Sequence, residues 1–114
     1  MKHETVIKAM HALNRLAGKD LPVKSACAVH RLRVLLRPVW EFHQEEETKL
    51  MRRLMRDGAF IDDAAREEWN KRIEEMSQLE AEGLEITPIA LPLPEDVTIT
   101  ANDVDALEGF VNFE

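Results

Sequence analysis

Apolar residues recur at helical spacing in three stretches within the first 83 residues. The first stretch predicts a short amphipathic helix over residues 4–17, with Gly18 placed to end it. Its apolar positions, three or four residues apart, are Val6, Met10, Leu13 and Ala17.

The second stretch predicts a long helix that starts at Pro22 and runs to the turn sequence Asp57-Gly58. About thirty-five residues at the helical rise would span more than about 50 Å. Pro38 lies inside this stretch and removes one backbone hydrogen bond, so a kink or a break is expected near Arg37. The sequence leaves open which of the two occurs.

The third stretch predicts a helix that begins at Asp62 or Asp63, either of which can cap it, and ends at Gly83. The short connection from the second helix predicts that the two return antiparallel, as a helical hairpin. The expected buried positions of this third helix are Ala65, Trp69, Ile73, Met76 and Leu79.

The pattern changes after Gly83. Alternation at 84–87 predicts a short edge strand, and 97–99 predicts a second one. The sequence Leu91-Pro92-Leu93-Pro94 between them favours an extended arm, since proline removes backbone donors. Thr100 resembles a helix cap and opens a short final helix through Leu107.

These elements predict a mainly α fold. An antiparallel helical hairpin with a short N-terminal helix occupies residues 1–83. A small β or extended C-terminal arm with a short final helix occupies residues 84–114. At 114 residues and 45% hydrophobic content, both parts are expected to pack into one single domain.

Composition points to a cytoplasmic protein. No apolar run reaches the roughly 18 residues that a membrane span needs, and the first residues lack the apolar stretch of a signal peptide. The single cysteine, Cys27, cannot form a disulfide framework within the chain and is expected to be a small buried residue.

The net charge of −7 is divided unevenly along the chain. Residues 1–40 carry eight Lys and Arg against two Asp and Glu, a net charge of +6, whereas residues 41–114 carry seven against twenty, a net charge of −13. The acidic half is expected to pack beside the basic half, within one subunit or between two. An acidic surface that imitates nucleic acid and a basic face that contacts phosphates are the alternatives, but no aromatic or glycine-rich pattern supports a nucleic-acid partner.

The residues of known catalytic motifs are missing, so the chain is not expected to be an enzyme. It contains no nucleophile elbow, phosphate-binding loop or zinc-protease motif, and four glycines leave little material for a phosphate cradle. His43 with Glu46 and Glu47 could share one helix face, but this spacing is common, and neither a metal nor a cofactor is expected.

The remaining candidates are contact residues. Trp40 and Trp69 lie at core-facing positions of their helices, or alternatively could anchor a partner. The proline-rich arm is expected to be a rigid connector and could alternatively be a ligand for another protein. The candidate interaction residues are Trp40, Trp69, Leu91, Leu93, Phe110 and Phe113.

The order of these elements resembles a family of small uncharacterised bacteriophage and prophage proteins. The likeness covers most of the chain and depends on the Leu21-Pro22-Val23-Lys24 helix start, the Glu- and Leu-rich hairpin, and the helix opened by Thr100 with Leu107 and Phe110. Members of this kind usually have a less acidic tail. The resemblance implies a viral or prophage origin and assigns no catalytic residue.

The sequence therefore predicts a non-enzymatic phage or prophage accessory protein that acts through protein contacts. Its expected partners are itself, as a dimer or higher oligomer, and another phage or host protein. The alternative is an acidic inhibitor of a host nucleic-acid-processing enzyme, which would use Glu41, Glu45, Glu67, Glu74 and Glu75.

Overall fold

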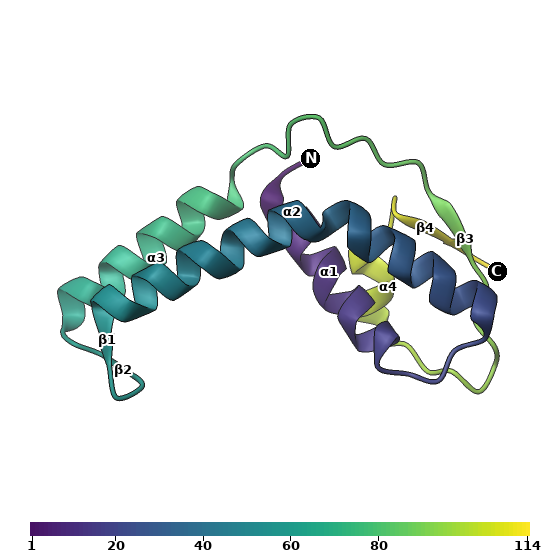
Figure 1. The fold of residues 1–114 in the computed structure, drawn as a ribbon, viewed down its shortest axis with the longest axis horizontal. Coiled ribbons are helices and arrows are strands. Elements are labelled where there is room, and N and C mark those ends of the chain that lie inside the picture. The colour runs from purple at the N-terminus through teal and green to yellow at the C-terminus, as the bar shows by residue number, and fades with distance from the viewer.

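The computed structural model describes all residues 1–114 and shows a mainly helical chain, as the sequence predicts (Figure 1). Two small two-stranded sheets accompany the helices. The elements in chain order are α1 (His3–Ala17), α2 (Val23–Leu54), β1 (Met55–Arg56), β2 (Ala59–Phe60), α3 (Asp63–Ser77), β3 (Ile89–Leu91), α4 (Ala101–Ala106) and β4 (Val111–Phe113).

The chain divides in space into a head and a projecting hairpin. The head contains α1, the first half of α2, α4 and the β3–β4 sheet, and the distal hairpin contains residues 41–77 (Figure 1). The radius of gyration is 16.4 Å and the extents are 48 × 31 × 21 Å. A compact domain of this length would have a radius of gyration of about 13 Å. The molecule is therefore elongated.

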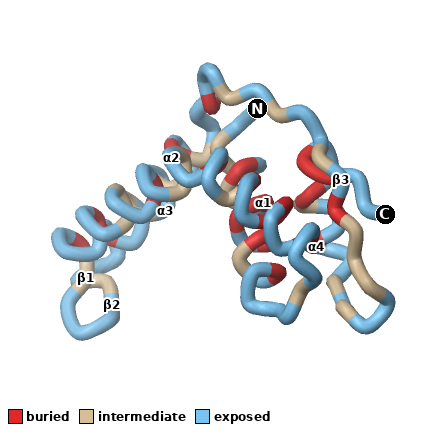
Figure 2. The backbone as a smooth tube through the Cα atoms, turned by 45° about the vertical axis from the view of Figure 1, so that its right-hand side comes forward, coloured by how far each residue is buried: buried red, intermediate tan, exposed pale blue.

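One main core fills the head. Figure 2 shows buried residues gathered where α1, α2, α4 and β3 meet. The core combines residues from both sides of Gly83, so the C-terminal arm packs directly on the N-terminal helices. Its largest buried members are Leu13, Leu16, Leu36, Leu91, Leu107 and Phe110.

The C-terminal arm is also held to α2 by a buried polar contact. The side chain of Ser25 is completely buried, and its hydroxyl donates a hydrogen bond to the carbonyl of Pro92. A proline residue keeps its carbonyl acceptor although it lacks a donor, so this bond satisfies the buried hydroxyl of Ser25.

The helix α2 continues through Pro38 and does not stop there. The ring is exposed, so the carbonyl of Val34, which loses its usual donor, lies on the solvent side of the helix. Buried residues before Pro38, including Leu32 and Leu36, and after it, including His43 and Leu50, hold both halves. Tertiary packing therefore outweighs the loss of one hydrogen bond.

The distal hairpin has a small core of its own. Leu50, Leu54 and Ala65 are buried together, and Phe60, Trp69 and Ile73 pack partly against them. The turn at its tip pairs β1 with β2, with Met55 opposite Phe60. Asp57 and Gly58 have φ angles of 53° and 80°, as the two central residues of a type I′ turn require.

The helix α3 begins as predicted but ends earlier. The Asp62 side chain caps it by accepting a hydrogen bond of 2.7 Å from the amide of Ala65. The helix ends at Ser77, so the prediction that it continues to Gly83 is wrong. Residues 79–81 instead pair with the start of the chain: His3 N–H donates to the Leu79 carbonyl, and Ala81 N–H donates to the Met1 carbonyl.

The predicted positions of the C-terminal strands are also wrong. Residues 84–87 and 97–99 form no strand, whereas β3 and β4 pair in parallel with Ile89 opposite Val111. Pro88 and Pro92 bracket β3, and the buried Leu91 fixes which face turns inward. The predicted cap of α4 is present, because the Thr100 hydroxyl accepts a hydrogen bond of 3.2 Å from the amide of Asp103.

Substitution of two phenylalanines near the C-terminus tests which residues belong to the core of the head. Phe110 is 1% exposed, whereas Phe113 is 39% exposed. We expect Phe110→Ala to lower the free energy of unfolding by about 3–5 kcal/mol, because it removes a fully buried ring. The matched variant Phe113→Ala should cost about 1 kcal/mol or less. Urea unfolding followed by circular dichroism measures both, and equal losses would contradict this placement of Phe110.

Candidate functional site

The candidate interaction residues do not form one surface. Trp69 lies in the distal hairpin, whereas the other five lie in the head. Leu91 and Phe110 are 0% and 1% exposed and belong to the core of this chain, so a partner cannot reach them in the folded state. Leu93 is partly buried, and Phe113 remains exposed beside the core.

Both tryptophans are partly buried and make edge-to-face aromatic contacts. The Trp40 ring lies 4.9 Å from the ring of His11, which joins α2 to α1. The Trp69 ring lies 6.0 Å from that of Phe60, which joins α3 to the turn of the hairpin. Such pairs stabilise packing between elements. Each tryptophan therefore has a structural role that accounts for its position.

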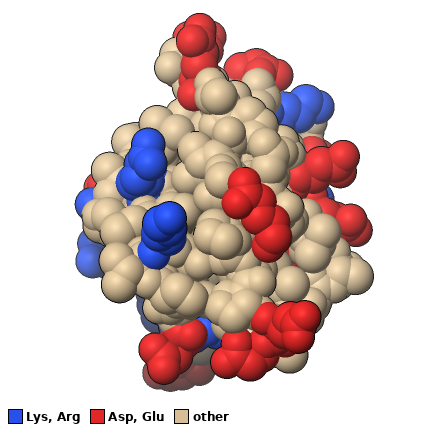
Figure 3. Space-filling model, turned by 90° about the vertical axis from the view of Figure 1, so that its right-hand side faces the viewer, with Lys and Arg blue, Asp and Glu red and all other residues tan.

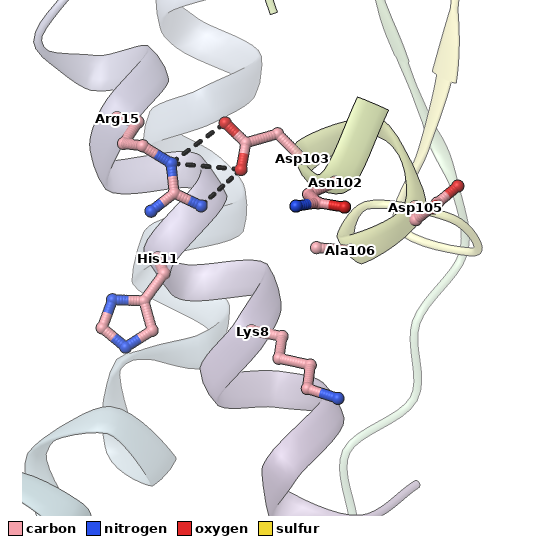
Figure 4. Close-up of a pocket in the computed structure, with 7 residues that line it drawn as sticks. All are labelled: Lys8, His11, Arg15, Asn102, Asp103, Asp105 and Ala106. Atoms are coloured by element: carbon pink, nitrogen blue, oxygen red, sulfur yellow. Dashed lines mark hydrogen bonds and ion pairs between the residues drawn. The ribbon is translucent and has the colours of Figure 1, made fainter. Parts of the chain in front are cut away.

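A polar hollow lies between α1 and α4 (Figure 4). Its volume is about 540 Å³. Arg15 and Asp103 face each other across it, and the Arg15 Nε lies 3.1 and 3.0 Å from the two carboxylate oxygens of Asp103. A second guanidinium nitrogen also contacts this carboxylate. The other lining residues are Lys8, His11, Asn102, Asp105 and Ala106.

This ion pair connects two segments that are distant in the sequence. Asp103 is 5% exposed, and the hydrogen bonds from Arg15 hold the pKa of its carboxyl below the ordinary value. The same bonds raise the pKa of the Arg15 guanidinium. Because each charged group satisfies the other, neither is free to act as an acid or a base. The pair fixes α4 on α1.

Removal of the carboxylate tests this role. We expect Asp103→Ala to lower the free energy of unfolding by about 1.5–3 kcal/mol, the usual contribution of hydrogen bonds to a charged group. The matched variant Asp105→Ala, an exposed carboxylate on the same helix, should change it by about 0.5 kcal/mol or less. Thermal and urea unfolding of both variants provide the comparison, and similar values would contradict a fixing role for the pair.

A pair of histidines lies where the head meets the distal hairpin. His3 Nδ1 lies 2.9 Å from His43 Nε2, and His43 is buried. The ring of Phe42 lies edge-on to both imidazoles. Burial lowers the pKa of both histidines, and the charge of His3 lowers the pKa of His43 further, whereas the carboxylate of Glu80 raises that of His3. One neutral ring donates to the other, so full protonation breaks the bond.

The lowered pKa values predict loss of stability in mild acid. A histidine with a lowered pKa in the folded state binds protons more readily when unfolded, so its contribution is present above a pH of about 6.5 and is lost below it. We expect a lower melting temperature at a pH of about 5 than at about 7.5. His43→Gln should reduce this difference when measured by circular dichroism. An unchanged pH dependence in that variant would exclude the histidine pair as its cause.

The side chains of His43 and Glu46 do not converge as the metal-site hypothesis for His43, Glu46 and Glu47 requires. His43 is directed to His3, and Glu46 forms an ion pair of 3.2 Å with Lys49. Three or more His, Cys, Asp or Glu side chains do not converge anywhere in the chain as a metal ion would need. Cys27, which the sequence predicts to be buried, is exposed on α2.

The acidic and basic halves of the sequence meet at two ion pairs, Arg15 with Asp103 and the amino group of Met1 with Glu80. The other seven Lys and Arg among residues 1–40 have no carboxylate partner within the chain. Figure 3 shows most of the visible Lys and Arg on one side of the end of the head, with Asp and Glu mainly on the other sides and near the centre, and uncharged areas between them.

A surface that the sequence analysis did not identify lies on α2. Its middle third exposes large apolar side chains, with Val34, Leu35 and Phe42 exposed by 45%, 44% and 38%. Two shallow hollows flank them, one beside Thr87 and Ile89 and the other beside Leu84. The sequence alone does not reveal this surface, because the side of α2 that is exposed depends on how α1 packs against the helix.

Comparison of the chain with family models, with curated proteins and with solved structures finds no match. None of the helices is both long enough and apolar enough to cross a membrane.

Proposed function

We propose that this chain is a non-enzymatic accessory protein that acts through protein contacts and associates with itself. The observation that carries the proposal is the excess of accessible surface, 7584 Å² in total. A compact monomer of 13.1 kDa would expose about 6,400 Å². The excess of about 1,200 Å² per chain is larger than the roughly 800 Å² that each partner buries in a standard specific complex.

The distribution of apolar residues supports the same function. Only 22 of 114 residues are buried, and ten large hydrophobic side chains are exposed in the head and the distal hairpin. An elongated molecule that leaves apolar surface in water gains free energy when a partner covers it. In line with the resemblance of the sequence, we propose that it serves a phage or prophage in the host cytoplasm, with another phage or host protein as a further partner.

The arrangement of charges on the distal hairpin weakens the acidic-inhibitor alternative. Glu41, Glu45, Glu67, Glu74 and Glu75 are all exposed. Exposed arginines lie among them on the same two helices, at positions 52, 53, 66 and 72. A continuous acidic ridge is what such an inhibitor would need to imitate a nucleic-acid backbone.

The solution mass of the full chain tests the proposed self-association. We expect the mass from light scattering to rise above 13.1 kDa with concentration over about 10 to 300 µM. A reducing agent is needed, because Cys27 is exposed and could form a disulfide between chains. Association should weaken between roughly 0.05 and 0.5 M salt if unpaired charges contribute to it. A monomer at every concentration would overturn self-association.

A further inference from the structure

The exposed face of α2 carries charges and apolar groups in a definite order. We call this face the α2 stripe, formed by Arg31, Val34, Leu35, Pro38, Phe42 and Glu45, all of which are exposed. At about 100° per residue these positions fall within a sector about 100° wide, so they share one side of the helix. Between Arg31 and Glu45 the order is basic, apolar and then acidic, whereas Lys49 and Arg52, farther along the same side of the helix, are basic.

This order makes the stripe complementary to itself. A twofold axis through Pro38 pairs each position with the one equally far on the other side of Pro38 in an antiparallel copy. Arg31 then faces Glu45 of a second copy, and Val34 faces its Phe42. Because a twofold interface uses the same patch on both subunits, each such contact occurs twice.

We propose that the α2 stripe is the surface through which two copies of this chain pair about a twofold axis at Pro38. The proposal names the partner and the surface for the self-association proposed above, and rests on it. The partner that binds the α2 stripe is a second copy of the chain, because the stripe carries a basic residue at one end and an acidic residue at the other. An unrelated acidic or basic partner would match only one end.

The charged ends of the α2 stripe are unsatisfied within one chain. Neither Arg31 nor Glu45 takes part in an ion pair. They are fourteen residues apart, about 21 Å along the helix, and therefore cannot reach each other. An ion pair between Arg31 and Glu45 can therefore form only between two chains.

The surroundings of the apolar centre leave room for a partner. The hollow beside Thr87 and Ile89 has a volume of about 450 Å³, and the one beside Leu84 about 410 Å³. Both share Leu35 as a wall, so they lie along the stripe and can receive apolar side chains of a second copy. A contact of this length is smaller than a standard interface, so a weak, concentration-dependent dimer is expected.

Charge reversal at the two ends tests the pairing. Arg31→Glu places two carboxylates together at each end of the dimer, and Glu45→Arg places two cations there. We expect each single variant to weaken dimerisation about tenfold, and the double variant R31E/E45R to restore it, because the exchange recreates two opposite-charge pairs. Sedimentation equilibrium measures the dissociation constants.

A mixture of the two single variants gives the sharpest result. A chain with R31E carries acidic groups at both ends of the stripe, and a chain with E45R carries basic groups at both. The two should form a heterodimer at concentrations where each alone is a monomer. The control is Arg37→Glu, which reverses an exposed charge on α2 outside the stripe and should leave dimerisation unchanged. Circular dichroism confirms that every variant is folded.

The outcomes separate this proposal from the proposed function. A dimer that resists R31E, E45R and Leu35→Glu lies on another surface, so the α2 stripe is overturned while self-association stands. An equal loss with Arg37→Glu also overturns the stripe, because the effect is then one of net charge alone. A wild-type monomer at all concentrations overturns both. Recovery in the double variant and in the mixture supports the pairing about Pro38.

Discussion

The structure depends on the burial of α1. Six of its residues are buried, and they form the centre of the core that α2, β3, α4 and β4 surround. The first half of α2 covers one side of α1, and the C-terminal arm covers another, fixed by the ion pair between Arg15 and Asp103. Because so much of α2 is held in this way, its second half can project from the head with few contacts of its own.

The sequence predicts the helices better than it predicts the strands. The periodicity of α1 is strong, and the caps at Asp62 and Thr100 depend only on local hydrogen bonds, so they can be predicted without the tertiary structure. The early end of α3 cannot be predicted in this way. It results from the pairing of residues 79–81 with the first three residues of the chain. The strands β3 and β4 could not be predicted either, because their paired residues, such as Ile89 and Val111, are 22 positions apart and no local turn joins them.

The roles of the candidate interaction residues also depend on the tertiary structure. Hydrophobicity alone selects Leu91 and Phe110, and these prove to be the most deeply buried of the set. A large apolar residue is equally suited to a core and to an interface, and only the packing of the whole chain decides between them. Val34 and Leu35 illustrate the same point, because they are as apolar as the buried Leu32 and Leu36 of the same helix and yet are 45% and 44% exposed.

The composition of the core also determines when it can form during synthesis. Translation adds about 5–20 residues each second, so the first half of α2 follows α1 directly, whereas the C-terminal segments that cover another side of α1 follow several seconds later. Phe110 and Val111 complete the core around α1, and they are among the last residues of the 114 to be made. The core of the distal hairpin needs only contacts between residues 50 and 73 and can close earlier. The side of α1 that the C-terminal segments cover therefore stays exposed in the nascent chain until those segments have been made, whereas α2 can cover the other side earlier.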